Sequence, residues 1–262
     1  MKNPLRKRFF RELREEIGKY LVVFILMAAT IGFVSGFLVA DGSMLTAYNN
    51  SFQKYNIEDG KFETEEKIYK NQQEDIEKKG VTLYENFYVE KALLNGTTLR
   101  IFKNRTKVDK VCLMKGKLPE KTGEIAIDRM YADNNKLSVG DSLQSGKRKW
   151  KITGLVALSD YSALFQNNND TMFDAVKFGA AVVTEEEFSS FNQSQLVYNY
   201  AWTYIHKPKT EAQEKKKSED FMEELGKDVT LEEFVPQYLN QAIHFTGDDM
   251  GGDRAMIIVL LY

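Results

Sequence analysis

The sequence has few of the residues that build disulfides and metal sites: one cysteine and two histidines among its 262 residues. Because a single cysteine, Cys112, cannot form an internal disulfide, a folded domain must be stabilised by an ordinary hydrophobic core. Its VCLM context predicts a buried strand position. His206 and His244 lie far apart, and no H-E-x-x-H or C-x-x-C spacing is present. The sequence therefore predicts no metal-binding residue.

Catalytic motifs are equally scarce. No G-x-x-x-x-G-K-[ST] loop is present, which excludes a P-loop ATPase, and no G-x-S-x-G supports a serine hydrolase. We therefore predict that the chain is not an enzyme and has no catalytic residue. Nucleic acid is not an expected partner either, because the bulk of the chain is acidic and its basic residues are interspersed with acidic ones, which leaves no continuous basic stripe.

One long uncharged stretch is present, from Tyr20 to Ala40. At about 1.5 Å per residue it spans roughly 30 Å, the hydrocarbon thickness of a bilayer, and it is apolar on every side. A cleaved signal peptide would have a shorter apolar run and a small-x-small site, and Leu38 occupies the first small position before Ala40. We interpret residues 20–40 as a transmembrane helix.

The charges on either side of this helix predict its orientation. Residues 1–20 contain seven basic and three acidic residues, a net charge of +4, whereas the rest of the chain has a net charge of −6. The positive-inside rule then places the N-terminus in the cytoplasm and the acidic body outside, in the plasma membrane.

Residues 1–19 show apolar side chains at i+4 spacing, including Leu5, Phe9 and Leu13. This predicts a basic amphipathic helix at the cytoplasmic surface, in contact with membrane lipid. Within the span, small residues recur every fourth position: Ala28, Gly32, Gly36 and Ala40. Such a ridge allows close packing against another membrane helix, so we expect it to be a packing surface.

Residues 41–254 are predicted to form one extracytoplasmic domain of mixed α+β class, in one or two lobes. Residues 45–55 should continue the membrane helix as a stalk, and Thr64 should cap a helix that ends at Gly80. From residue 81 the pattern is that of strands, with a hairpin turn at Asn95-Gly96.

A series of turn and strand motifs follows: G-x-L-P, G-E-I-A-I, L-x-V-G-D and K-I-T-G-L-V. Their order resembles the extracytoplasmic core domain of FtsX-like/MacB-type ABC transporter permeases. The family fold motif comprises Gly116, Pro119, Gly123, Glu124, Val139, Gly140, Asp141 and Gly154. In that family the domain lies between the first and second membrane helices, and the motif identifies a fold rather than a chemistry.

The rest of the domain sequence predicts two strands, a buried one at FGAAVVT and one at YNYAWTYIHK. It also predicts three helices: one capped by Thr184 and Glu187, an exposed one over 209–225, and one that begins with Thr230 and Glu233. The loop over 159–174 has aromatic shoulders, and Phe165, Met172 and Phe173 are candidates for contact with a partner or anchors of a solvated loop. Residues 255–262 are apolar, and we expect them to begin a second transmembrane helix of a longer protein, after a pliable joint at Gly251 and Gly252.

Two functions are compatible with these features. The resemblance implies the N-terminal part of a permease subunit that couples a separate cytoplasmic ABC ATPase to movements of the extracytoplasmic domain, in export, extraction or activation of a partner. It also implies that ATP is bound by that partner and that this chain has no cofactor, and it leaves open whether a second permease copy pairs with this one. The alternative is a stand-alone membrane-anchored binding or sensory domain.

Overall fold

The computed structural model describes residues 14–260 and divides the chain into two units. One unit comprises residues 1–48 and 249–262, and the other comprises residues 49–248. Most of the amphipathic helix predicted for residues 1–19 lies outside the described residues.

Helix α2 (Ile17–Tyr55) contains the predicted span and continues through the predicted stalk without a break. It is long and apolar enough to cross a membrane, and none of its apolar window is buried by the rest of the chain. Three hydroxyl side chains donate hydrogen bonds to the carbonyl four residues earlier: Thr30, Ser43 and Thr46, at 2.8, 2.8 and 2.7 Å. Because these polar groups are satisfied within the helix, they cost little in an apolar environment.

Helix α7 (Gln241–Leu260) is the last described element. It starts 14 residues before the predicted second span, and it passes through Gly251 and Gly252 as regular helix. The predicted joint at these glycines is therefore helical, and its pliability stays a prediction. Among the described residues, α2 is the one helix that meets the length and composition of a membrane span.

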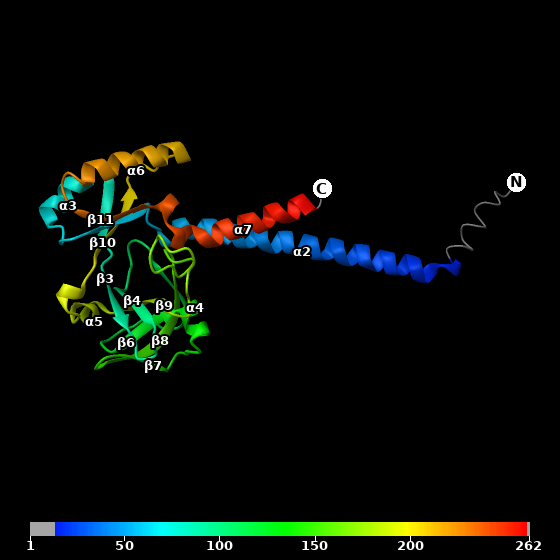
Figure 1. Cartoon of the computed structure of the whole chain (residues 1–262), viewed down its shortest axis with the longest axis horizontal. Helices are drawn as coiled ribbons and strands as arrows, with labels where there is room; N and C mark the ends of the chain where they lie inside the picture. The colour runs from blue at the N-terminus through cyan, green and yellow to red at the C-terminus, as the bar shows by residue number, and fades with distance from the viewer. Residues whose placement is uncertain (1–13, 261–262) are drawn as a thin grey trace. The chain divides into compact units, whose positions relative to one another are not determined.

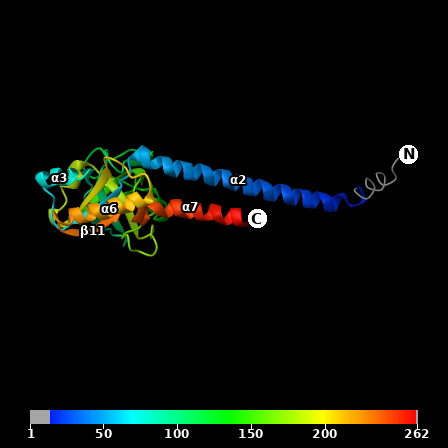
Figure 2. The same ribbon diagram turned by 90° about the horizontal axis from the view of Figure 1, so that it is seen from above.

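A four-stranded antiparallel sheet is formed by β1 (Gly60–Thr64), β2 (Val81–Glu85), β10 (Tyr198–Tyr204) and β11 (Leu231–Pro236). Its order is β11-β1-β10-β2. Helix α3 (Lys70–Glu77) packs near β2, and α6 (Glu211–Leu225) lies alongside β11 in both views (Figures 1 and 2). We call residues 56–86 and 197–240 the small-sheet region.

Aromatic rings fill the core of the small-sheet region. Trp202 stacks on Phe234 with ring centroids 4.8 Å apart, and Phe221 of α6 meets Trp202 edge-on at 5.2 Å. Gly60 is required beside this ring, because a Cβ atom there would lie 2.2 Å from Trp202. The core thus depends on aromatic contacts between strands that are distant in sequence.

One helix predicted for the small-sheet region starts later than expected, and a second one is wrong. Thr64 ends β1 instead of capping a helix, and α3 begins only at Lys70. Thr230 precedes β11, so Glu233 lies in a strand. In both places a threonine followed closely by glutamates favours a helix cap, but strand pairing of the neighbouring aromatic residues prevails.

A seven-stranded mixed sheet is formed by residues 87–196, which we call the large-sheet region. Its strands are β3 (Tyr88–Ala92), β4 (Thr98–Lys103), β5 (Val111–Gly116), β6 (Glu124–Asp128), β7 (Ser142–Ser145), β8 (Arg148–Leu158) and β9 (Phe178–Val183). Their order is β3-β4-β9-β6-β8-β5, and β7 pairs with β8. Two short helices, α4 (Arg129–Asn134) and α5 (Glu185–Ser189), follow β6 and β9.

The large-sheet region follows the sequence predictions closely. Gly96 turns between β3 and β4 with φ of +80°, and Ile125 and Ile127 on β6 are fully buried. The prediction that Cys112 is buried is wrong, because it lies on edge strand β5 and is only half-buried. The edge position explains the exposure, because β5 is paired on one side alone.

Glu187 has a larger role than the predicted helix cap. The Thr184 hydroxyl accepts a hydrogen bond from Glu187 N, as expected. The Glu187 carboxylate, however, points into the sheet, where Trp150 Nε1 and Arg148 donate to Oε1 at 2.8 and 2.9 Å and Gly123 N donates to Oε2 at 2.9 Å. One buried carboxylate therefore joins α5, β8 and the turn before β6.

Candidate functional site

The end of α2 is bound to the loop between β4 and β5. Lys110 N donates to the Tyr55 carbonyl at 2.9 Å, and Asp109 N donates to the Asn56 carbonyl at 3.0 Å. Asn56 Nδ2 donates in return to the Lys107 carbonyl at 2.9 Å. Asn56 and Asp109 have φ of +50° and +46°, a conformation that Asn and Asp adopt more readily than most residues. The chain therefore turns out of α2 at a defined point on the large-sheet region.

The start of α7 is bound to the loop that follows β8. The Ser162 hydroxyl donates to the carbonyls of Ala242 and Ile243 at 2.9 and 2.8 Å. Further along this loop, Asn168 Nδ2 donates to the Leu239 carbonyl and Asn168 Oδ1 accepts from Gln241 N, both at 3.0 Å. The loop over 159–174 thus provides partners for backbone groups at the N-terminal end of α7.

This loop is the one that the sequence marked as a candidate partner surface. Phe165 is buried, and its ring packs edge-on against Phe173 and Phe245 with centroids 5.9 and 5.6 Å apart. Met172 is 77% exposed. Phe165 and Phe173 are therefore engaged with the start of α7, and Met172 is the residue of the three that is open to solvent.

A cluster of buried charged and polar side chains lies between these two attachments. Arg105 and Asp160 form a two-pronged ion pair, with Nη1 to Oδ2 at 2.7 Å and Nη2 to Oδ1 at 2.6 Å. Asp109 Oδ1 accepts from Glu58 N at 2.9 Å, and its Oδ2 accepts from Asn86 Nδ2 at 3.3 Å. We call Glu58, Asn86, Arg105, Asp109, Asp160 and Asn240 the junction cluster.

The junction cluster connects both sheet regions with both long helices. Glu58 lies between α2 and β1, Asn86 joins β2 to β3, and Asn240 precedes α7 and donates to Glu58 Oε1 at 3.4 Å. The other three residues belong to the large-sheet region. Every member is at most 7% exposed, so the cluster is shielded from solvent.

Burial controls the protonation of the cluster. Loss of solvation, reinforced by the negative charge of Asp160, raises the pKa of Asp109 to about 7. Burial also raises the pKa of Glu58 well above its ordinary range, with the charges of Asp109 and Asp160 adding to the effect. Arg105 stays charged, because its guanidinium pKa is raised by Asp160 despite its burial. The cluster therefore combines a permanent cation with carboxyls that can hold protons near neutral pH.

A second buried arginine strengthens the attachment of the 159–174 loop. Arg100 on β4 donates to Glu90 on β3 at 2.6 Å, to the Tyr161 hydroxyl at 2.9 Å and to the Gln166 carbonyl at 2.8 Å. Its guanidinium also lies over the Tyr88 ring at 4.2 Å from the centroid. The loop that holds α7 is thus itself fixed to the face of the large sheet.

The family fold motif occupies turns and strand ends of the large-sheet region. Gly116 has φ of +77°, and a Cβ there would lie 2.3 Å from the Thr153 carbonyl, while a Cβ on Gly154 would lie 2.4 Å from the Lys117 carbonyl. These two glycines allow the backbones of β5 and β8 to approach closely.

The other motif residues have comparable structural roles. Pro119 and Glu124 are buried, and Glu124 accepts from Glu120 N at 2.9 Å. Asp141 accepts from Ser138 N at 2.8 Å, Gly123 and Gly140 have positive φ, and Val139 lies beside Gly116. The motif therefore determines local geometry and none of these contacts provides a reactive group.

The predicted membrane ridge is exposed in the described chain. Ala28, Gly32, Gly36 and Ala40 all lie on uncovered parts of α2, and a Cβ built on either glycine would meet no described atom within 4 Å beyond the adjacent backbone of α2. Their role as a packing surface stays a prediction.

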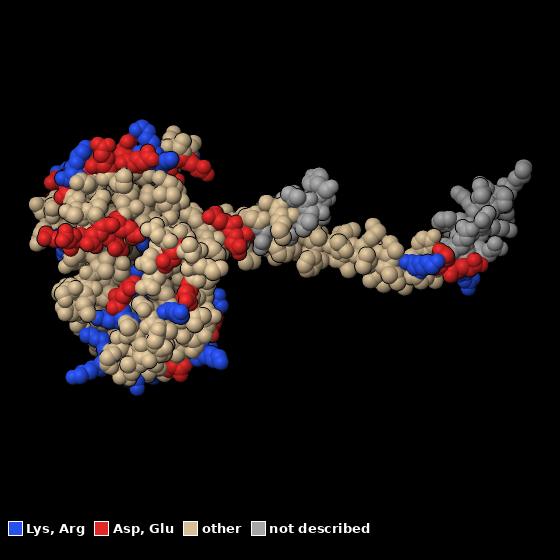
Figure 3. All heavy atoms as spheres, viewed as in Figure 1, with Lys and Arg blue, Asp and Glu red and all other residues tan. Residues whose placement is uncertain are grey.

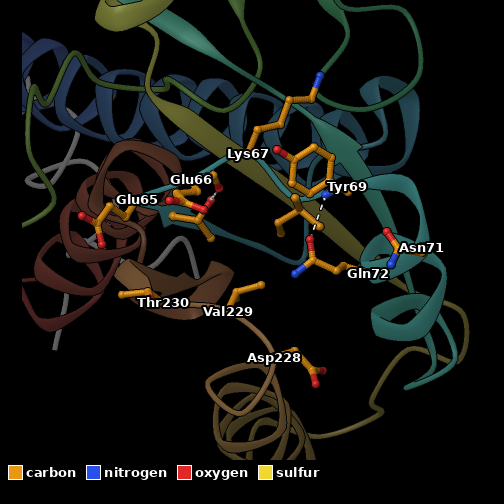
Figure 4. A pocket seen from close by; sticks show the side chains of 11 residues that line it. Glu65, Glu66, Lys67, Tyr69, Asn71, Gln72, Asp228, Val229 and Thr230 are labelled. Atoms are coloured by element: carbon orange, nitrogen blue, oxygen red, sulfur yellow. Dashed lines mark hydrogen bonds between the residues drawn. The ribbon is translucent and has the colours of Figure 1, made fainter.

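A polar pocket opens at one end of the small sheet, between the loops before α3 and before β11 (Figure 4). Its volume is about 500 Å³. Asp228 is paired with Lys79 at 3.0 Å and Lys67 with Glu85 at 3.2 Å, whereas Glu65 and Glu66 form no ion pair with any described residue. The pocket therefore offers negative charge and hydrogen-bonding groups.

A metal site is not formed by any group of three or more His, Cys, Asp or Glu side chains within residues that the structure describes. The members of the junction cluster were missed by the sequence analysis. They come from five separate segments, so their spacing follows no sequence motif. The one local signal is a charged residue directly beside a buried strand, as in Asp160 after β8.

Comparison with known proteins gives structural likeness alone. No family model matches the chain, and no curated protein matches it. Among solved structures, the chain is similar to the periplasmic region of MacB from Actinobacillus actinomycetemcomitans, with 11% identity, a TM-score of 0.41 and coverage of 68% of this chain and 87% of that one.

Two further structures are similar to the chain. The extracellular domain of the noncanonic ABC-type transporter YknZ from Gram-positive bacteria has 9% identity, a TM-score of 0.34 and coverage of 66% and 98%. A domain of a protein described as a permease, from Porphyromonas gingivalis, has 13% identity, a TM-score of 0.26 and coverage of 59% and 69%.

Proposed function

We propose that this chain is the N-terminal part of an ABC transporter permease subunit of the FtsX-like/MacB type. In this proposal α2 crosses the plasma membrane with its N-terminus in the cytoplasm, and the domain of two sheets lies outside the cell. A separate cytoplasmic ATPase binds ATP and drives the movement, and this chain transmits it to the extracytoplasmic domain.

The observation that carries the proposal is the double attachment at the junction cluster. The end of α2 and the start of α7 are each bound to loops of the large-sheet region, and Arg105, Asp109 and Asp160 lie in those loops. A displacement of either helix along its axis would therefore act directly on the domain. An anchored domain with no mechanical role needs only one flexible connection, so the double attachment favours the permease.

The decisive experiment is purification of the full-length protein with its ATPase. We expect a P-loop ATPase to co-purify and its turnover to respond to the permease. Asp160→Asn should retain the ATPase but uncouple its turnover from movement of the domain, because it weakens the Arg105 ion pair that holds the 159–174 loop. The surface variant Lys216→Ala is the matched control and should behave as wild type. A protein that purifies without any ATPase and still binds an extracytoplasmic ligand would instead support the anchored binding or sensory domain.

Topology is tested separately. In a Cys112→Ser background, a cysteine at Asn71 should react with an impermeant thiol reagent in intact cells, and a cysteine at Asn3 should react only after lysis. This follows from the net charge of +4 in residues 1–20. The opposite labelling pattern would contradict export of the domain.

A further inference from the structure

The junction cluster contains more carboxyls than cations. Glu58, Asp109 and Asp160 lie together, and the cations that act on them are Arg105, in the loop after β4, and Lys61, on β1. If all five groups were ionised, they would carry one uncompensated negative charge, and the three carboxyls that share it are buried. Burying such a charge costs free energy, so the folded junction is most stable when one carboxyl holds a proton.

The geometry indicates which carboxyls share this proton. Both oxygens of Asp160 accept from Arg105, at 2.6 and 2.7 Å, so Asp160 is stabilised as the anion. Asp109 accepts from two neutral donors, Glu58 N and Asn86 Nδ2. Glu58 Oε1 accepts from the neutral Asn240 amide, and Glu58 Oε2 is buried without a hydrogen-bond partner among the described residues. Glu58 and Asp109 are therefore the pair with the least compensated charge.

These two residues also occupy the mechanically important positions. Asp109 N and Asp109 Oδ1 bind the chain where it leaves α2, and Glu58 accepts from Asn240 immediately before α7. Glu58 therefore contacts both connections, and Asp109 contacts the one that leaves α2.

We propose that Glu58 and Asp109 form a proton-dependent latch, which holds the end of α2 and the start of α7 against the large-sheet region while the pair retains one proton and releases them when both carboxyls are ionised. The latch makes the attachment of the helices sensitive to the acidity outside the cell. It is a property of the domain itself and needs neither an ATPase nor a transported substrate.

The direction of the effect follows from proton linkage. The pKa of Asp109 is raised to about 7, and that of Glu58 is raised as well, so the folded junction binds protons that the unfolded chain releases. The stabilisation is complete below the ordinary carboxyl pKa and is lost as the pH rises through the raised values. The junction is thus closed in acid and loosened in alkali.

The test is amide hydrogen exchange of the full chain in detergent at about pH 5.5 and about pH 8.5, with rates corrected for intrinsic exchange. We expect residues 104–111 and 240–247 to exchange about tenfold faster at the higher pH, while β9 does not change. Asp109→Asn should abolish this difference, because the remaining Glu58 and Asp160 carboxylates balance Arg105 and Lys61. Asn also tolerates the positive φ at this position.

Two controls make the result specific. Glu58→Gln should abolish the difference in the same way, and it replaces the first variant if that one does not fold. Asp128→Asn alters another buried carboxyl, at the start of α4, and should leave the difference unchanged. Equal corrected exchange at both pH values in wild type, or a pH difference that persists in Asp109→Asn or Glu58→Gln, would overturn the latch. Carboxyl carbon NMR of wild type is a second measurement, and no junction carboxyl titrating between about pH 5 and 9 would overturn it equally.

Discussion

The small-sheet and large-sheet regions bury their strands in different ways. In the large sheet, every residue of β6 and β9 is buried, as is typical of strands covered on both faces. In the small sheet, β1 alternates between buried and half-buried residues, and the core consists of large aromatic rings. The large sheet therefore has a continuous core, whereas the stability of the small sheet depends on a few large side chains.

The two regions also differ in charge. The small-sheet region has 18 acidic and 11 basic residues, and the large-sheet region has 13 acidic and 16 basic residues, so their net charges are −7 and +3. Figure 3 shows acidic side chains dense near α6 and basic side chains at the rim of the part that contains the large sheet. The junction cluster joins these regions of opposite net charge, and a soluble partner would meet a different electrostatic field on each.

The strongest test of this comparison removes one buried tryptophan from each sheet. Trp202→Ala and Trp150→Ala should each lower the free energy of unfolding by about 3–5 kcal/mol. Trp202→Ala should increase hydrogen exchange in the small-sheet region alone, since its ring contacts are with Phe62, Phe221 and Phe234. Denaturant unfolding with exchange mass spectrometry measures both effects. Global unfolding in Trp202→Ala would show that the large sheet is not an independent frame.

A milder substitution distinguishes hydrogen bonding from packing. Trp150→Phe should cost about 1–3 kcal/mol beyond its packing loss, because Trp150 Nε1 donates to the Glu187 carboxylate at 2.8 Å. Trp202 Nε1 forms no such bond to a carboxylate in the described chain, so Trp202→Phe should be the less costly of the two. Urea unfolding of both variants gives the comparison, and equal costs would contradict the role of Glu187.

A change of pH should have a smaller effect on the stability of the large-sheet region. Burial raises the pKa of Asp128 to about 6, although it accepts hydrogen bonds from Met130 and Tyr131 N. Its contribution to stability is complete below pH of about 4 and is lost as the pH rises to about 6, a change of roughly 2–3 kcal/mol. Asp128→Asn keeps the helix cap and should flatten the unfolding free energy over this pH range. An unchanged pH profile in the variant would mean that Asp128 is already ionised in the folded protein.

The smallest effect is expected on the surface of the small-sheet region. Lys216 pairs with Asp220 at 2.9 Å on α6, and both side chains are well exposed. Lys216→Ala should change the free energy of unfolding by less than about 0.5 kcal/mol, because solvent screens exposed pairs. Thermal unfolding checks this, and a loss above about 1 kcal/mol would assign α6 a structural role that its exposed charges do not suggest.

The sequence was most informative where the relevant signal is local. The apolar run in α2, the Asn95-Gly96 hairpin and the strands around Ile125 and Ile127 could all be predicted from neighbouring residues. The helix start expected at Thr64 and the helix expected after Thr230 were wrong, since strand pairing with partners far along the chain overrides a short capping pattern.

The junction cluster could not be predicted for the same reason. Glu58 and Asn240 are separated by most of the domain sequence, and their polar side chains match no spacing rule. Phe165 and Phe173 were identified as notable aromatics, but only the three-dimensional arrangement reveals that they pack on Phe245.

The strands β1 and β2 both pair with strands that come much later in the chain, which has a consequence for folding during synthesis. Neither strand pairs with the other: β1 pairs with β10 and β11, and β2 pairs with β10, more than a hundred residues later. The large sheet, in contrast, is made entirely of consecutive strands between Tyr88 and Val183. Because the chain is synthesised from its N-terminus, the large sheet can form first. Until β10 has been synthesised, β1 and β2 stay unpaired and are prone to aggregate. Closure of the small sheet is then the late step at which a folding factor would have most effect.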